Sequence, residues 1–372
     1  QGMDVVTYTG TGSTQSITGL DFQPDLVWIK QRNTTRNHQI VDSVRGATKD
    51  LRSNTATDEG TTSTGLTAFT SDGFTLGGDA GYNQSSGTYV AWCWNAGANS
   101  DKTYTVKVVS DSGNKYRFDD FGTSAVTLDL QEGSTYVFDQ SDSSNAGHPI
   151  RFGTSANGTD YTTGVTHTGT PGSAGAKTTL VLGTGVATLY YSCANHSGMG
   201  GQINTNSTAG ASNFNGSIQA TTKASTTYGF SAVSYTGNNS TSTVGHGLNA
   251  VPRWVIVKSR SADSPTGWMV KHSSLQSNYN LALNLTDTAW NPATNGWVGD
   301  LTSSTTFSLV NGSSNGNNVN QSNVTYIAYC WSEVPGFSKF DSYSGGTNPK
   351  TITTGFKPKF VIIKRTDTAN YW

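Results

Sequence analysis

Charged side chains are scarce in this sequence. Only 13% of the 372 residues are Asp, Glu, Lys or Arg, and the formal net charge is −1. A nucleic-acid-binding surface needs clustered Lys and Arg to neutralise phosphates, so we expect no nucleic acid among the main partners. No apolar run approaches the roughly 18 residues that a membrane-spanning helix needs, and we therefore expect no membrane span.

Cysteine is also rare, with three residues in the whole chain. Cys93 and Cys330 occupy matching positions in an internal repeat, so a bond between them would join the interiors of two domains. Such a bond is implausible, and we expect single buried thiols in place of a disulfide framework.

The common catalytic motifs are absent. The sequence has no Gly-x-Ser-x-Gly elbow, no phosphate-binding P-loop and no His-Glu-x-x-His pair. Two acidic pairs, Asp58-Glu59 and Asp119-Asp120, are better interpreted as solvated turn residues than as paired catalytic acids. The scattered His38, His167 and His246 are interpreted as surface or turn residues, as is His272. We therefore expect that the protein is not an enzyme.

Aromatic residues and glycine are plentiful. Phe, Trp and Tyr make up 10% of the chain, and 43 residues are Gly. Short apolar runs alternate with turns of Gly, Asn, Ser and Thr, and no long segment has an apolar period of 3.6 residues. This pattern predicts an all-β fold whose cores are filled by large aromatic side chains.

An internal repeat occupies most of the chain. Three segments, 8–30, 235–258 and 343–364, share a Tyr-x-Gly triplet, a Gly-Leu or Gly-Phe pair, and a Pro six residues before a Lys. The residues between that Pro and Lys are apolar in all three, which predicts a buried strand. The two complete copies also end alike, at 88–94 and 325–331. Each copy is predicted to be a jelly-roll-like β-sandwich of about 100 residues, the copies standing in tandem.

The third copy carries the clearest form of this motif. Residues 355–364 read Gly-Phe-x-Pro-x-Phe-Val-x-Ile-Lys, a pattern that resembles repeats in tail-fibre and other appendage proteins of marine phages. The resemblance implies a structural or attachment function in a virion, or in an assembly on a cell surface or outside the cell. It also implies partners of that setting, namely further copies of the chain, other virion or surface proteins, or a host-surface glycan.

A cluster of metal-binding residue types lies between the first two copies. Cys193, His196 and Met199 are spaced as Cys-x2-His-x2-Met directly after a strand-like run, and His148 lies upstream. Two His and one Cys with a weak axial Met form the ligand set of a mononuclear blue-copper site, and soft sulfur ligands favour copper.

The same region resembles the cupredoxins, the β-sandwich family of plastocyanin and amicyanin. The resemblance rests on these residues and on segments 128–138 and 188–193, and it covers about 101–222. It implies an inserted Greek-key sandwich holding one copper ion, with His148, Cys193 and His196 as equatorial ligands and Met199 on the axis. Many members have Asn after the first His, where this chain has Pro149. Asn145 and Asn195 are both candidates for the missing hydrogen bond, and the sequence leaves the choice open.

These patterns predict four segments: a first sandwich at 1–100, the cupredoxin-like domain at 101–222, a second sandwich at 223–338 and an incomplete third at 339–372. Because the chain begins without Met and ends within a repeat, we expect a processed chain or a fragment.

Other interpretations stay open at this point. Cys193 and Met199 also suit plain core positions. The inserted domain would then be kept only for its architecture. Two further alternatives are a secreted electron-transfer protein tethered by sandwiches and a glycan-binding adhesin. The adhesin would use Trp290 and Trp297, which lie in an Asn-, Pro- and Gly-rich segment.

Overall fold

The computed structural model describes residues 1–261, 267–292, 295–312 and 318–372. It is nearly all β, with 39% of residues in strands and 2% in helices, arranged in several separate sheets. The predicted all-β, sandwich-type fold is confirmed. No helix within the described residues is long and apolar enough to cross a membrane.

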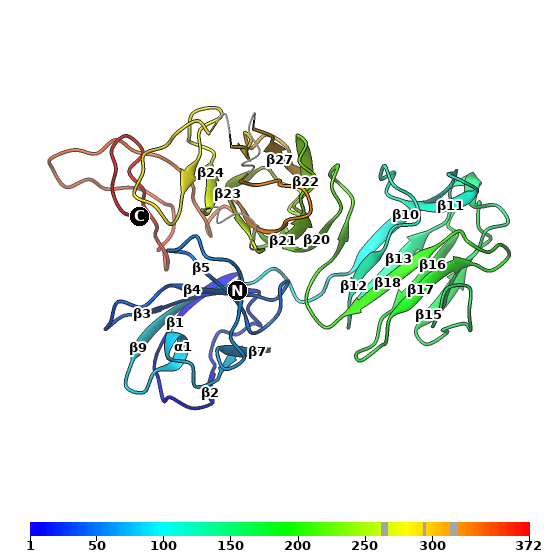
Figure 1. The fold of residues 1–372 in the computed structure, drawn as a ribbon, viewed down its shortest axis with the longest axis horizontal. Helices are drawn as coiled ribbons and strands as arrows, with labels where there is room; N and C mark the ends of the chain where they lie inside the picture. Colours follow the sequence, from blue (N-terminus) through cyan, green and yellow to red (C-terminus); the bar gives the residue numbers. More distant parts are fainter. Residues whose placement is uncertain (262–266, 293–294, 313–317) are drawn as a thin grey trace. The chain divides into compact units, whose positions relative to one another are not determined.

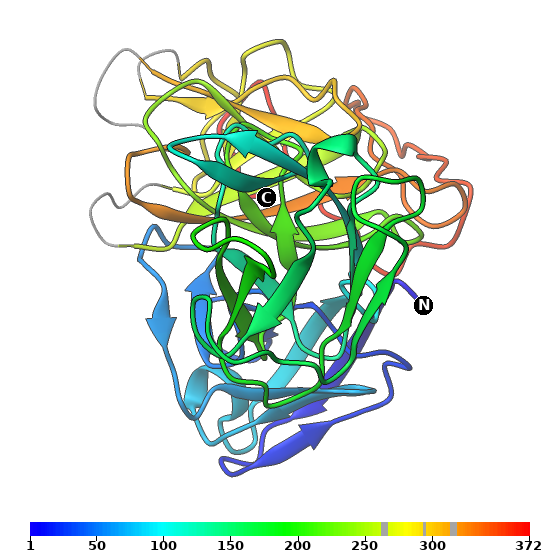
Figure 2. The ribbon, with the colours of Figure 1, turned by 90° about the vertical axis from the view of Figure 1, so that its right-hand side faces the viewer.

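The chain divides into two compact units. One contains residues 1–98 together with 222–372, and the other contains residues 99–221. The segments predicted as separate sandwiches at 1–100 and 223–338 therefore belong to one unit, which the sequence alone did not indicate. Figures 1 and 2 show the chain from two directions, coloured by sequence.

The first sandwich of the larger unit has one large and one small sheet. A single helical turn, α1 (Ala80–Asn83), precedes its last strand. The large sheet has the order β1 (Met3–Thr9), β9 (Thr88–Trp94), β3 (Leu26–Gln31), β4 (Gln39–Asp42), β5 (Lys49–Arg52), β6 (Gly60–Thr61), and the small sheet has the order β2 (Gln15–Ile17), β8 (Gly73–Leu76), β7 (Leu66–Thr70).

The second sandwich repeats this strand order. Its large sheet contains, as consecutive neighbours, β20 (Ala220–Ser225), β21 (Phe230–Thr236), β28 (Thr325–Ser332), β23 (Pro252–Ser259), β24 (Met269–His272), β25 (Leu281–Ala282), and its small sheet has the order β22 (Ser242–Gly245), β27 (Thr306–Val310), β26 (Trp297–Val298). The register also agrees: Tyr8 pairs with Tyr89 in the first copy as Tyr235 pairs with Tyr326 in the second. The two tyrosine pairs stack with ring centroids 5.0 and 5.1 Å apart. The two copies thus share the register of these central strands.

The last strand of each copy lies at the centre of its sheet. Both β9 and β28 pair with a strand on each side, and Cys93 and Cys330 on them are completely buried. All three cysteines of the chain are free thiols. The sequence prediction of single buried thiols agrees with this arrangement.

A buried ionic network joins the two sandwiches. Arg45 forms an ion pair with Asp42, and both side chains are fully buried. The Tyr329 hydroxyl of the second sandwich donates to Asp42 Oδ2 at 2.6 Å. Glu59, predicted to be a solvated turn residue, is instead only 12% exposed and forms ion pairs with Arg45 and with Arg260 of the second sandwich. The partners that bury Glu59 come from a distant part of the sequence, so the local pattern could not indicate them.

The third copy forms no strand over residues 339–372. The strand predicted between Pro358 and Lys364 is therefore wrong for this chain. In the first two copies the equivalent strands, β3 and β23, lie between two hydrogen-bonding neighbours. Residues 339–372 contain no counterpart of those neighbours, and a lone strand leaves its backbone groups unpaired.

The smaller unit, 99–221, is a sandwich of two sheets around an aromatic core. Its buried residues include Tyr104, Phe118, Phe138 and Tyr191, and Cys193 belongs to the same core. One sheet has the order β11 (Asn114–Phe118), β10 (Lys102–Ser110), β13 (Thr135–Asp139), β16 (Lys177–Val181), β15 (Val165–Thr168), and the other has the order β12 (Leu128–Gln131), β18 (Gly201–Asn206), β17 (Leu189–Cys193), β14 (Ile150–Gly153), with β19 (Ala211–Asn213) following in the chain.

Candidate metal centre

Strand pairing brings the predicted ligands together. Cys193 is the last residue of β17, and it pairs directly with Ile150, the first residue of β14. The ladder continues one step further, because the Ala194 amide donates to the Pro149 carbonyl at 2.9 Å. His148 therefore lies beside the end of β17, where the loop that contains His196 begins. Cys193 at the end of β17, His196 in the loop that follows and His148 just before β14 therefore meet at the same end of the sheet.

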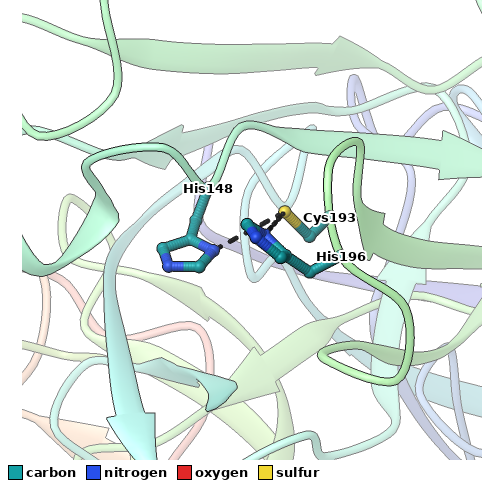
Figure 3. A group of neighbouring side chains, drawn as sticks. All are labelled: His148, Cys193 and His196. Carbon is teal, nitrogen blue, oxygen red and sulfur yellow. Dashed lines mark hydrogen bonds between the residues drawn. The ribbon is translucent and has the colours of Figure 1, made fainter.

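The three nearest ligand atoms face one another. The Nδ1 atom of His148 lies 3.8 Å from Cys193 Sγ, and the Nδ1 atom of His196 lies 3.6 Å from it. The two imidazole centroids are 4.6 Å apart, and the ligand atoms all lie within 4.8 Å of one another. Figure 3 shows both rings turned towards the sulfur. Within the described residues this is the one group of three or more His, Cys, Asp or Glu side chains placed to hold a metal ion.

These separations fit a shared metal ion. With metal–sulfur and metal–nitrogen bonds of about 2.3 and 2.0 Å, tetrahedral or trigonal angles place sulfur and nitrogen about 3.5–3.7 Å apart. The observed distance of 3.6 Å from His196 lies within this range, and the distance of 3.8 Å from His148 lies about 0.1 Å above it. The donor set therefore fits one ion bound by Cys193, His148 and His196.

The site has a buried side and an exposed side. Cys193 is 2% exposed and Met199 is 1% exposed, and both belong to the apolar core of the sandwich. His148 is half-buried, whereas His196 is exposed. Burial, together with the neighbouring His196 imidazole, lowers the pKa of His148, which keeps it in the neutral form that binds metals. Met199, the fourth predicted ligand, is thus buried in the core, whereas the imidazoles lie towards the surface.

Asn195 joins the two ligand loops. Its side-chain amide donates to the Gly147 carbonyl at 2.9 Å, directly before His148. Asn145, the other candidate, instead donates to the Val106 carbonyl at 2.7 Å and is fully buried. Of the two candidates, Asn195 is therefore the one that links the loop after Cys193 to the loop before His148.

Two further side chains hold the backbone of His148. The Tyr116 hydroxyl and the Gln140 amide both donate to the His148 carbonyl at 2.8 Å. Burial raises the pKa of Tyr116, so its hydroxyl stays protonated as a donor. Sequence reasoning missed both residues. Tyr116 lies on β11 and Gln140 just after β13, and no local motif links either position to the ligands.

The Cys-x2-His-x2-Met loop is fixed at its far end. The Met199 carbonyl accepts a hydrogen bond from the Tyr116 amide at 2.9 Å, and the Lys115 ammonium donates to the Gly198 carbonyl. Gly200 is required for this closure, because a Cβ there would lie 1.7 Å from the Tyr191 carbonyl oxygen. These protein contacts hold the loop in place, as expected for a preorganised site.

The two predicted glycan contacts are partly buried and lie in the second sandwich. Trp290 forms an isolated antiparallel bridge with Asn280. Trp297 is not in a loop but in β26, where it pairs with Val310. Residues 293–294 between them lie outside the described residues.

Comparison with known proteins gives one match. Residues 2–128 and 202–372 match a family described as a domain of unknown function, DUF7483. No curated protein and no solved structure matches the chain. All four predicted ligands lie between the two matched stretches, so the family match itself carries no information about the metal centre.

Proposed function

The chain belongs to the DUF7483 family, whose function is unknown, and from the geometry of its inserted sandwich we propose that it binds one copper ion there. The observation that carries the proposal is the convergence of Cys193 Sγ and two imidazole Nδ1 atoms on one point. Cys193 would bind as the thiolate and both histidines as neutral imidazoles, with Met199 as a weak fourth ligand.

Copper is favoured over zinc by the chemistry of the donors. Structural zinc sites have four strong ligands, usually Cys and His, and catalytic zinc sites keep three plus water. This site offers one thiolate, two imidazoles and a thioether from a buried Met, which is the donor set of blue-copper proteins. When bound, such a copper ion supplies one-electron redox chemistry. The chain's own contribution is to hold both Nδ1 atoms in place through the backbone contacts of His148 and the Asn195 bridge.

We propose a structural or attachment role for the protein as a whole. Two sandwiches that share the order of five strands in the large sheet and three in the small sheet, with few charges and a buried ionic network between them, suit a rigid appendage of a virion or an extracellular surface assembly. The copper ion would then stabilise the inserted sandwich, because metal binding adds to the folding free energy of the domain that forms its site. Partners would be further copies of the chain or other surface proteins.

The alternative of a tethered electron-transfer protein is favoured by the exposure of His196, which brings a ligand ring to the surface. Rapid electron exchange with a soluble redox partner, lost on His196→Ala but kept by a surface variant such as Lys177→Ala, would support it. The adhesin alternative makes a different prediction, namely glycan binding that is lost on Trp290→Ala and Trp297→Ala.

The experiment that tests copper binding is a titration of the metal-free full-length chain with Cu(II), followed by visible absorption. We expect an intense thiolate-to-copper band that saturates at one ion per chain. Cys193→Ala should abolish it, whereas Cys330→Ala, which removes a completely buried thiol elsewhere, should leave it unchanged. A band that survives Cys193→Ala, or copper retained with no band at all, would refute the proposed ligand set.

A further inference from the structure

The same contact between copies of the repeat occurs twice in the larger unit. The Trp268 indole donates to the Arg52 carbonyl at 2.9 Å, which joins the second copy to the first. The Trp372 indole donates to the Ala282 carbonyl at 2.9 Å, which joins the third copy to the second. Arg52 and Ala282 are equivalent, because Arg52 ends β5 opposite Gln39, the first residue of β4, and Ala282 ends β25 opposite Met269, the first residue of β24.

A second hydrogen bond confirms the equivalence. The Glu59 amide donates to the Arg260 carbonyl at 3.0 Å, and the Ala289 amide donates to the Thr366 carbonyl at 3.0 Å. The donors Glu59 and Ala289 lie seven residues after Arg52 and Ala282, respectively. The acceptors Arg260 and Thr366 lie two residues after the Lys that ends the repeat motif, which is Lys258 in the second copy and Lys364 in the third. One head-to-tail interface therefore joins copy one to copy two and copy two to copy three.

The third copy also contacts the first. The Phe360 ring lies 5.3 to 6.4 Å from the rings of Trp28, Trp92 and Trp94, measured between centroids, and Lys359 forms an ion pair with Asp4 at 2.8 Å. Trp94 in turn lies 5.9 Å from Trp331 of the second copy. All three copies thus meet at Trp94. A head-to-tail interface that brings the third member back to the first closes into a ring.

The ring has one open interface. On the first copy, the residues equivalent to Arg260 and Trp268 are Arg32, which is exposed, and His38, which is half-buried. On the third copy, Val361 and Ile363 are 65% and 53% exposed, although their equivalents in the first copy, Val27 and Ile29, are completely buried. The open face of the first copy and the exposed apolar residues of the third therefore border the same position in the ring.

We propose that this surface, formed by Arg32, His38 and residues 358–364, docks a polypeptide carrying the remaining strands of the repeat, which completes a third sandwich and closes a pseudo-threefold ring. The partner is defined by the two interfaces already present. At the position equivalent to Arg52 and Ala282, the partner has a backbone carbonyl that faces His38. At the position equivalent to Glu59 and Ala289, it has a backbone amide that faces the Arg32 carbonyl. Where it carries a carboxylate at the Glu59 position, that group pairs with the Arg32 guanidinium, as Glu59 pairs with Arg260 at 2.8 Å.

The test extends the full chain beyond Trp372 in two ways. One extension copies residues 39–98, which carry Glu59, and the other copies residues 269–332, which carry Ala289 at the same position. In both we expect monomers in which the amides of 359–364 become protected from hydrogen exchange. Arg32→Gln should lower the thermal midpoint of the first extended chain only. In the second, and in the unextended chain, Arg32 has no carboxylate partner and the substitution should have no effect.

Three results would contradict the proposal or a part of it. Residues 359–364 that stay unprotected in both extended chains would show that the surface does not accept the remaining strands. Dimers of the unextended chain that dissociate on Arg32→Gln, seen by light scattering, would show that a second copy of the chain is the occupant instead. An equal effect of Arg32→Gln in both extended chains would contradict the assigned pairing with the Glu59 position.

Discussion

Replacing Arg45 by Met should destabilise the larger unit severely. The Arg45 side chain is fully buried and pairs with Asp42 and Glu59, and it also donates to the Ile40 carbonyl at 3.0 Å and the Tyr329 hydroxyl at 3.3 Å. Its removal leaves the Asp42 carboxylate buried without a cation. Breaking a buried ion pair in this way costs about 3–5 kcal/mol of unfolding free energy.

The assay follows from the distribution of tryptophan. All nine Trp residues lie in the larger unit, so their fluorescence reports the unfolding of that unit alone. For a unit of this size, the loss corresponds to a fall in melting temperature of about 6–20 °C, at about 2–4 °C per kcal/mol. Urea titration followed by fluorescence should give the same ranking of variants.

Arg52→Met is the matched control. Its side chain is 39% exposed and lies 3.6 Å from Asp50, so its loss should cost only about 0–1 kcal/mol. Because Asp42 is the group left uncompensated, adding Asp42→Asn to Arg45→Met should recover part of the loss. An Arg45→Met variant no less stable than Arg52→Met would refute the view that this network holds the two sandwiches together.

Three further predictions concern single side chains. Asn195→Ala removes the bridge to the Gly147 carbonyl and should weaken copper binding about 10–100-fold, measured by competition with a chelator, whereas Asn215→Ala, which changes an exposed side chain of the same unit, should not. Met199→Leu should keep the copper and cost less than about 1.5 kcal/mol of stability, yet shift the copper reduction potential, and Met269→Leu in the other unit should shift nothing. His246 is completely buried, and burial lowers its pKa to about 4, so it is neutral when folded and protonates more readily when unfolded. Stability should therefore fall by about 3 kcal/mol as the pH drops from about 6.5 to 4, and fluorescence-monitored unfolding of His246→Gln should show a flatter profile over that range.

The sequence predicts what depends on local pattern. Strands β3 and β23 are continuous apolar runs that follow a turn, which is why the all-β fold can be predicted from the sequence. The tyrosines of β9 and β28 recur at the same positions, which is why the repeat can be predicted as well. The order of His148, Cys193 and His196 likewise indicates a metal site before any geometry is known. What brings them together is the register of β14 against β17, which agrees with that expectation.

Contacts between distant segments could not be predicted in the same way. His246 was expected at the surface, yet it is buried, and its Nε2 lies 3.4 Å from the carbonyl oxygen of Ser303, 57 residues further along the chain. The sequence predicts Glu59 to be a turn residue, and its ion pair with the distant Arg260 is visible only in the structure. The choice of Asn195 over Asn145 depends on which amide reaches Gly147, a matter of loop geometry that spacing does not determine.

The central claim is that Cys193, His148 and His196 hold one copper ion. X-ray absorption at the copper edge of the copper-loaded full chain tests it most directly, because it identifies the atoms bound to the metal. We predict one short copper–sulfur bond and two imidazole nitrogens, with the sulfur lost in Cys193→Ala. A copper environment of nitrogen and oxygen only, unchanged by Cys193→Ala, would contradict the account.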